Sequence, residues 1–217
     1  DKCAQYMQNA VFMIPTPGLL ATAVDMISNL EMKDIDTKGD LYEYLLAKIA
    51  QAGVNGQFRT PRHIGKMMVE LADIKPDDII CDPACGTAGF LVCATLYLRE
   101  KYPEAFMDAK FNKHFSENMF YGYDFDYSML RIASMNMMTH GHKNPNIEYQ
   151  DSLSEDVSSL ADFCTCVIAN PPFKGSLNAD TIAKNIVSAV KTTKTELLFL
   201  ALMIRILKSG GRACVIV

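Results

Sequence analysis

The sequence predicts an α/β protein whose centre is a doubly wound, mostly parallel sheet, preceded by a helical N-terminal segment. Two observations predict this class. From residue 78 onward, short apolar runs of strand length alternate with stretches of helical periodicity, and a turn rich in proline and glycine joins the first such run to its helix. Strands that alternate with helices form parallel sheets, because each helix carries the chain back across the sheet. The 217 residues are 49% hydrophobic, enough to fill such a core.

Residues 1–55 are predicted to form the N-terminal helical segment. Helical periodicity extends to Ile14, resumes over residues 19–30 after two prolines, and returns over 41–49 after a turn expected at Gly39. A glycine-containing stretch ends this segment. The next helix is expected to begin with Thr60 as N-cap and Pro61 in its first position.

Residues 56–217 are predicted to form the second domain, which carries the alternating elements. A turn at Gly210 and Gly211 is expected before the last strand, and residues 174–195 are expected to form a long loop. The chain opens without methionine and stops inside an apolar run, so we expect a piece of a longer protein. The strands are predicted at 78–82, 119–124, 147–150, 163–169 and 212–217, and helices at 60–71, 90–98, 127–139 and 196–207.

Net charge and cysteine content limit the classes of function that the sequence allows. The formal net charge is -4, so the sequence predicts no general attraction to nucleic acid, and DNA binding would need a local basic patch or another subunit. Seven cysteines without the paired C-x2-C spacing of zinc sites favour a reduced, cytoplasmic protein with no metal site. No apolar run is long enough to cross a bilayer, so no membrane partner is expected.

The first predicted strand ends in the loop D-P-A-C-G-T-A-G-F, residues 82–90. Gly86 and Gly89 permit a tight turn and a close approach of the backbone to a ligand. Neither phosphate-binding fingerprint is met, because Ala84 stands where G-x-G-x-x-G has its first glycine, and G-x-x-x-x-G-K-[ST] is absent. Asp82, at the end of the strand, would attract an ammonium group and repel a phosphate.

An acidic residue also ends the second predicted strand, in Y-G-Y-D. One carboxylate can accept hydrogen bonds from both hydroxyls of a ribose, and Asp124 is placed for that role. A ribose clamp and a loop that suits an ammonium group together indicate S-adenosyl-L-methionine as cofactor. The alternative is a glycine turn followed by a surface aspartate, and the order of the two features along the chain favours the cofactor site.

The stretch A-N-P-P-F-K-G, residues 169–175, ends the fourth predicted strand at the same edge. Methyl transfer to an amino nitrogen requires acceptors that localise the nitrogen lone pair, and the Asn170 side-chain oxygen and the Pro171 carbonyl are such acceptors. Pro171 and Pro172 stiffen the turn because they fix φ and lack N–H donors. Phe173 offers a ring face to a planar base taken out of a duplex. The alternative is a strand stop with an incidental asparagine.

With these motifs, and with G-Q-F-R-T-P-R at 56–62 ahead of them, the chain resembles the modification subunit of type I restriction-modification systems, an S-adenosylmethionine-dependent DNA adenine N6-methyltransferase. The resemblance implies a methyltransferase sheet, with 56–217 as a catalytic domain truncated at its C-terminal end. The catalytic turn would be Asn170, Pro171, Pro172 and Phe173. Cofactor contacts would come from Gln57, Phe58, Arg59, Thr60, Pro61, Arg62, Asp82, Ala84, Gly86, Thr87, Ala88, Gly89, Asp124 and Asp151. One departure is Ala88, where many members have glycine.

The same resemblance implies the partners. Duplex DNA with its target adenine flipped out would be the substrate, sequence readout would belong to a specificity subunit, and a restriction subunit would complete the system. An N5-glutamine or ribosomal-RNA amino methyltransferase, which shares the N-P-P-aromatic turn, is the alternative, although G-Q-F-R-T-P-R argues against it. The missing dinucleotide fingerprint disfavours a nicotinamide-dependent oxidoreductase, and the intact Asn170 and Phe173 disfavour a non-catalytic scaffold.

Overall fold

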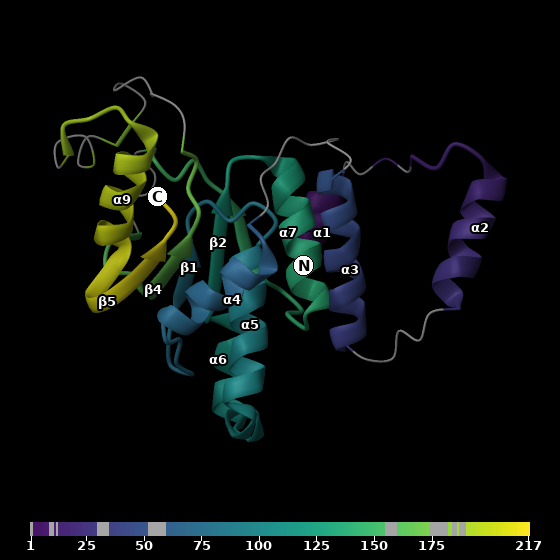
Figure 1. The fold of residues 1–217 in the computed structure, drawn as a ribbon, viewed down its shortest axis with the longest axis horizontal. Coiled ribbons are helices and arrows are strands. Elements are labelled where there is room, and N and C mark those ends of the chain that lie inside the picture. Colours follow the sequence, from purple (N-terminus) through teal and green to yellow (C-terminus); the bar gives the residue numbers. More distant parts are fainter. Residues whose placement is uncertain are drawn as a thin grey trace.

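The computed structural model describes residues 2–8, 11, 13–29, 35–51, 60–154, 160–173, 182, 183, 186 and 190–217. Within these ranges lies a five-stranded sheet of order β3-β2-β1-β4-β5, in which every neighbouring pair of strands is parallel (Figure 1). The strands are β1 (Ile80–Asp82), β2 (Phe120–Asp124), β3 (Asn146–Tyr149), β4 (Cys164–Ala169) and β5 (Leu207–Val215). The predicted α/β class with a parallel, doubly wound sheet is therefore confirmed.

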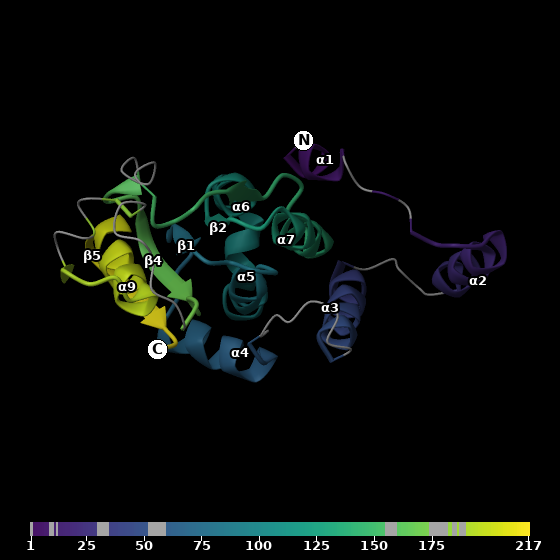
Figure 2. The same cartoon turned by 90° about the horizontal axis from the view of Figure 1, so that it is seen from above.

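Helices cover both faces of this sheet (Figure 2). Successive strand residues point to opposite faces, as the pleat requires. Ile80 and Ile168 pack with the helices of one face, whereas Cys81 and Val167 pack with α9 on the other. The helices of the first face are α4 (Arg62–Leu71), α5 (Gly89–Lys101), α6 (Ala109–Glu117) and α7 (Tyr127–Thr139), with a 3-10 turn at Pro103–Met107, and the second face carries α9 (Thr195–Ile206).

Among the described residues ahead of α4 lie the helices α1 (Lys2–Met7), α2 (Pro17–Ser28) and α3 (Ile35–Gln51). α1 and α3 pack against α7 at the side of the domain (Figure 1). The Tyr6 carbonyl accepts a hydrogen bond from Arg131 Nε at 3.1 Å, and Tyr42 donates its hydroxyl hydrogen to the carbonyl of Ile132 at 3.3 Å. α7 thus carries the main contacts of the two helices, and Tyr6 also donates its hydroxyl hydrogen to the carbonyl of Ile147 in β3 at 3.0 Å.

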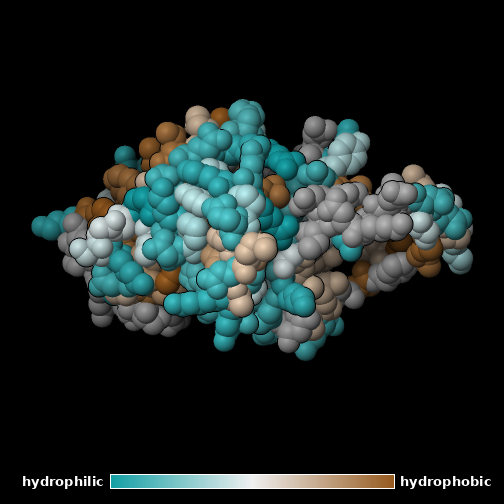
Figure 3. Space-filling view, turned by 90° about the horizontal axis from the view of Figure 1, so that it is seen from below, coloured by the Kyte–Doolittle hydropathy of each residue, from teal (hydrophilic) through white to brown (hydrophobic). Residues whose placement is uncertain are grey.

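α2 stands apart from the sheet domain and buries none of its side chains. Its apolar residues Leu19, Val24, Met26 and Ile27 are exposed. Figure 3 shows hydrophobic side chains mixed with hydrophilic ones at the end of the molecule where Figure 1 places α2, and the middle of that face is mostly hydrophilic. Among the helices that the structure describes, none is long and apolar enough to span a membrane.

Two predicted turns were wrong. Gly39 lies inside α3, because the helix begins at Ile35 and packs its glycine closely against His140. Gly210 and Gly211 lie inside β5, which pairs with β4 on both sides of them. The register slips there, since Cys164 pairs with Leu207 and Cys166 with Arg212, and Gly210 takes a φ of 80° within the irregular stretch. Pairing with β4 therefore overrode the local turn signal.

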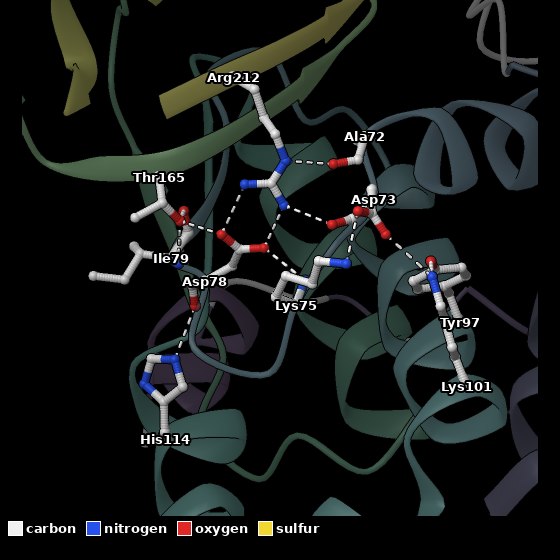
Figure 4. Close-up of polar contacts among 10 residues, drawn as sticks. All are labelled: Ala72, Asp73, Lys75, Asp78, Ile79, Tyr97, Lys101, His114, Thr165 and Arg212. Carbon is white, nitrogen blue, oxygen red and sulfur yellow. Dashed lines mark hydrogen bonds and ion pairs between the residues drawn. The ribbon is translucent and has the colours of Figure 1, made fainter. Parts of the chain in front are cut away.

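An ion pair at the amino ends of the strands fixes the C-terminal end of α4 to the sheet (Figure 4). Arg212 Nη2 lies 2.5 Å from Asp78 Oδ2, and Nη1 donates to Oδ1 at 3.0 Å. The same guanidinium donates to the carbonyls of Ala72 and Asp73, which follow α4. Burial opposes ionisation of Asp78, but hydrogen bonds from Arg212 and Thr165 outweigh it and lower the pKa of that carboxyl. This anchor sets the position of α4, whose other end reaches the candidate site.

Candidate functional site

The loops that carry the predicted site residues meet at one edge of the sheet. β1 and β4 are neighbours, although β2 and β3 lie between them along the chain, so the strand order reverses between them. Ligands of doubly wound sheets bind outside the carboxyl ends of the strands at such a reversal. Asp82 ends β1 and Asn170 follows β4, so both lie beside this point.

The loop after β1 takes a conformation that glycine permits. Gly86 has a φ of 51°, and a Cβ placed on it would meet nothing within 4 Å, so backbone conformation rather than crowding calls for glycine there. Ala88 also has a positive φ, 60°, and its methyl group is fully buried just before α5 begins. Gly89 is the first residue of α5, and a Cβ placed on it would approach only the Thr87 hydroxyl, at 3.9 Å. The loop therefore leaves open space above Gly86.

Asp124 ties this loop to the end of β2. Its Oδ2 accepts a hydrogen bond from the backbone amide of Gly86 at 3.0 Å, and its Oδ1 accepts one from Asp126 N at 2.9 Å. A second contact joins the same two segments, since Cys85 N donates to the carbonyl of Tyr123 at 2.9 Å. Each carboxylate oxygen keeps a further lone-pair site, so Asp124 can still accept hydrogen bonds from a ligand.

Asp82 is fully buried beneath the loop. Its Oδ1 accepts a hydrogen bond from Ala84 N at 3.1 Å, whereas Oδ2 is buried with no hydrogen-bond partner among the described residues. The pKa of Asp82 is raised to about 8, mainly by burial and in part by the negative charge of Asp124. The hydrogen bond from Ala84 N lowers this pKa, but by less. A buried carboxyl without a complete set of partners is costly, so a cationic group bound at this edge would be its natural complement.

The loop after β3 completes the same edge. Ser152 donates its hydroxyl hydrogen to the carbonyl of Pro83 at 2.6 Å, which joins this loop to the one after β1. Asp151 is exposed, and its Oδ1 accepts a hydrogen bond from Leu153 N at 3.1 Å. Gln150 N donates to the carbonyl of Asp124 at 3.0 Å. Three consecutive loops are therefore joined to one another by hydrogen bonds.

Asn170 lies in the turn after β4, where Pro171 is buried and Phe173 is 46% exposed. Its Nδ2 donates a hydrogen bond to Thr60 Oγ1 at 3.1 Å, whereas its Oδ1 is buried without a hydrogen-bond partner among the described residues. The prediction that Thr60 caps α4 was wrong: Pro61 is the N-cap and no side-chain hydrogen bond caps this helix. The Thr60 hydroxyl instead accepts the hydrogen bond from Asn170.

The structure brings most of the predicted site residues to this edge. Pro61 lies beside Thr60, and the Arg62 guanidinium pairs with Asp40 of α3 at 3.0 Å on the surface. Gln57, Phe58 and Arg59 lie outside the described residues, as does the expected domain boundary at residue 55. Among the residues that the structure describes, no cluster of three metal-ligating side chains occurs.

Sequence patterns missed several residues at this edge. The buried Asn136 of α7 donates to the Thr87 carbonyl at 2.8 Å and to Glu43 Oε1 of α3 at 2.9 Å, so it joins the glycine loop to the N-terminal helices. Phe125, directly after Asp124, is 70% exposed. Tyr127 and Tyr149 stack with ring centroids 4.6 Å apart. An exposed aromatic after a strand-end acid is a signal that could have identified Phe125, whereas no local pattern marks Asn136.

Comparison with known proteins gives a consistent family. The family model described as N-6 DNA Methylase matches residues 33–217. The methylase subunit of the type I restriction enzyme EcoEI from Escherichia coli is 32% identical over 215 residues, which cover 97% of this chain and 41% of that protein. The methylase subunit of the enzyme MjaIX from Methanocaldococcus jannaschii is 35% identical over 143 residues, which cover 65% of this chain and 23% of that protein.

Solved structures agree with these sequence relatives. The crystal structure of the EcoKI M protein of a type I restriction enzyme superposes with a TM-score of 0.65 and 30% identity, covering 73% of this chain and 33% of that one. A type I restriction enzyme modification subunit from Vibrio vulnificus superposes with a TM-score of 0.78 and 26% identity, covering 99% of this chain and 45% of that one. The chain thus spans less than half the length of the relatives it matches.

Proposed function

This chain belongs to the N-6 DNA methylase family, and we propose on that premise that it forms part of an enzyme that transfers a methyl group from S-adenosyl-L-methionine to N6 of adenine in DNA. The observation that carries this proposal is the buried Oδ1 of Asn170 in the turn after β4, which has no hydrogen-bond partner among the residues that the structure describes. That turn lies at the point of strand-order reversal, beside the glycine loop. An acceptor without a donor at this place suits a substrate amino group.

The residues at the sheet edge fit S-adenosyl-L-methionine. The Oδ2 of Asp82, which no described residue hydrogen-bonds, suits an ammonium group, and the space above Gly86 admits a ligand close to the backbone. Asp124 would hold the ribose, Phe125 offers a ring face to the adenine, and Asp151 would accept from its amino group. The contacts predicted from Thr60, Pro61, Arg62, Ala84, Thr87, Ala88 and Gly89 belong to the same proposal. When bound, this cofactor supplies a methyl group on a positively charged sulfur.

The turn residues would prepare the substrate nitrogen. The lone pair of an adenine amino group is delocalised into the ring, and acceptors for its two hydrogens favour the geometry in which the lone pair is localised. Asn170 Oδ1 and the carbonyl of Pro171 are two such acceptors. Pro171 and Pro172 hold this carbonyl in place, because neither residue can enter a helix interior without cost. The exposed ring of Phe173 offers a face on which the base stacks.

A base in a duplex cannot reach this edge, so the target adenine must leave the stack. We propose that a specificity subunit reads the DNA sequence and that a restriction subunit completes a type I system, since similar chains are methylase subunits of type I restriction enzymes. This division of work suits a chain whose formal net charge is -4. We expect this activity in the cytoplasm, where the DNA of cells without a nucleus, such as those of the two relatives, lies.

The test uses the full-length protein assembled with its specificity subunit. Asn170→Ala should lower transfer of labelled methyl groups to duplex DNA by about 100-fold or more, because the acceptor that orients the amino group is removed. The variant should keep most of its affinity for S-adenosyl-L-methionine. Asn118→Ala, at an exposed cap at the far end of α6, is the matched control and should transfer at the wild-type rate.

Three results would count against the proposal. Undiminished transfer by the Asn170→Ala variant would remove the role of this residue. Label found in ribosomal RNA or in a protein glutamine, rather than in DNA adenine, would favour the other methyltransferase class. Failure of the wild-type assembly to bind S-adenosyl-L-methionine would contradict the cofactor.

A further inference from the structure

We propose that Thr60 is the positioning residue for Asn170: its hydroxyl accepts the hydrogen bond from Asn170 Nδ2 and so holds the amide with Oδ1 turned toward the substrate. This inference rests on the proposed function, because it concerns how the acceptor for the adenine amino group is oriented. The two residues lie 110 positions apart in the chain and meet only through the fold. Their contact of 3.1 Å joins the start of α4 to the turn after β4.

The orientation of an asparagine amide decides what the group can do. Its two ends have nearly the same shape, but the oxygen accepts hydrogen bonds and the nitrogen donates them. An amide turned the other way would present Nδ2 to an adenine amino group, and two donors repel each other. The catalytic turn therefore needs a partner that distinguishes the two ends of Asn170.

The Thr60 hydroxyl can make this distinction when its own hydrogen is used elsewhere. A hydroxyl both donates and accepts, so it would pair with either end of the amide if its hydrogen were uncommitted. Among the described residues, none takes the hydrogen of the Thr60 hydroxyl, which leaves it available to a ligand at the N-terminal end of α4. When a ligand takes that hydrogen, the lone pairs of the hydroxyl face Nδ2, and Oδ1 has no partner among the described residues.

The placement of Thr60 is also well supported. α4 is fixed at its C-terminal end by Arg212, which donates to the carbonyls of Ala72 and Asp73. It is packed into the core through Gly65 in its middle and Met68 and Val69 in its last turn, all of them buried. Thr60 therefore sits at the end of a helix held at its other end and along its length, which is a suitable support for a group that must keep an exact direction.

The experiment compares Thr60→Val with Thr60→Ser in the full-length protein assembled with its specificity subunit. Valine keeps the shape of threonine without the hydroxyl, and serine keeps the hydroxyl without the methyl group. At saturating S-adenosyl-L-methionine and DNA, Thr60→Val should lower kcat by about 10- to 100-fold, because misplacing a reacting group by about 1 Å can cost about 100-fold. Thr60→Ser should recover most of that loss. Thr22→Val, which removes an exposed hydroxyl on α2, is the matched control and should keep the wild-type kcat.

The possible results separate this inference from the proposed function. If the wild type is active and Thr60→Val keeps the wild-type kcat but binds the cofactor more weakly, Thr60 is a cofactor contact. That result would overturn the inference. Equal losses for the valine and serine variants would also overturn it, because the hydroxyl would then not be the operative group. If thermal unfolding shows that the loss of kcat in Thr60→Val only reflects a smaller amount of folded protein, the inference is also overturned. A wild-type assembly that methylates no adenine would contradict the proposed function and the inference together.

Discussion

Gly39 of α3 lies directly against the ring of His140, which follows α7: a Cβ at position 39 would sit 2.5 Å from Nε2. The ring is 2% exposed, and its Nδ1 lies 2.8 Å from the carbonyl of Asn136. It therefore has no room to move aside. The same Asn136 donates to Thr87 of the glycine loop, so the docking of α3 and the shape of that loop depend on one stretch of α7.

Gly39→Ala should loosen α3 from the sheet domain. Alanine favours a helix interior over glycine by about 1 kcal/mol, but the methyl group would meet the buried His140 ring, and overpacking of this kind costs about 1–3 kcal/mol. We expect faster proteolysis of the segment that contains α3 and a lower unfolding temperature. Gly18→Ala, on α2, is the matched control, because a Cβ there would meet nothing within 4 Å. Equal proteolysis of the two variants would contradict the tight contact.

Asp124→Ala should weaken cofactor binding. The substitution removes the carboxylate proposed to hold the ribose and the acceptor of the Gly86 amide, and hydrogen bonds to a charged group are each worth about 1.5–3 kcal/mol, so the dissociation constant should rise by about 10-fold or more. Isothermal titration with S-adenosyl-L-methionine measures this. Asp126→Ala, which removes the N-cap of α7, should destabilise the helix yet leave the dissociation constant near that of the wild type. An unchanged titration curve for Asp124→Ala would remove its role as ribose clamp.

Asp82 should make the free protein less stable as the pH rises. Burial raises its pKa to about 8, so between the ordinary carboxyl range and pH 8 the folded state holds a proton that the unfolded state releases. The stabilisation is complete below the unfolded pKa and is lost as the pH rises through the folded pKa. Urea unfolding at a series of pH values should show a decline that Asp82→Asn reduces. Asp108→Asn, which keeps an N-cap acceptor on α6, should leave the slope unaltered. If the stability of Asp82→Asn declines with pH as steeply as that of the wild type, Asp82 is not a buried, protonated carboxyl.

Arg212→Met should destabilise the fold by about 3 kcal/mol, because it leaves the buried Asp78 without its cation. Arg212 and Thr165 lower the pKa of Asp78, so the stability that this carboxylate contributes is present above its ordinary pKa and is lost as the pH falls through the folded pKa. The variant should therefore lose less stability on acidification than the wild type. Denaturant unfolding at neutral and acid pH measures both effects. As a control, Lys75→Met removes the nearby exposed ion pair with Asp73 and should lower the free energy of unfolding far less. Equal losses of stability in the two variants would contradict the larger contribution of the Arg212–Asp78 pair.

The sheet and the strand-end acids could be predicted because both depend on local pattern and on one topological rule. β2 and β4 are buried on both faces, so they appear as apolar runs, and parallel strands bring Asp82, Asp124 and Asn170 to one edge. The errors arose where distant contacts overrode local signals. Gly39 lies in a helix that packs on His140, and Thr60 serves Asn170 rather than the helix that follows it. The helix α6 was not predicted; its phenylalanines, Phe111 and Phe115, pack on each other and on Phe106 and Phe120.

The stacked rings of Tyr127 and Tyr149 give the protein an intrinsic optical signal. The chain contains nine tyrosines and no tryptophan, so its ultraviolet fluorescence is that of tyrosine alone. This pair lies beside Asp124, where β2 and β3 end, and both rings are more than half exposed. A molecule that settles at that edge would change the surroundings of these two rings and with them their emission. Occupancy of the site can thus be followed by light, without a label.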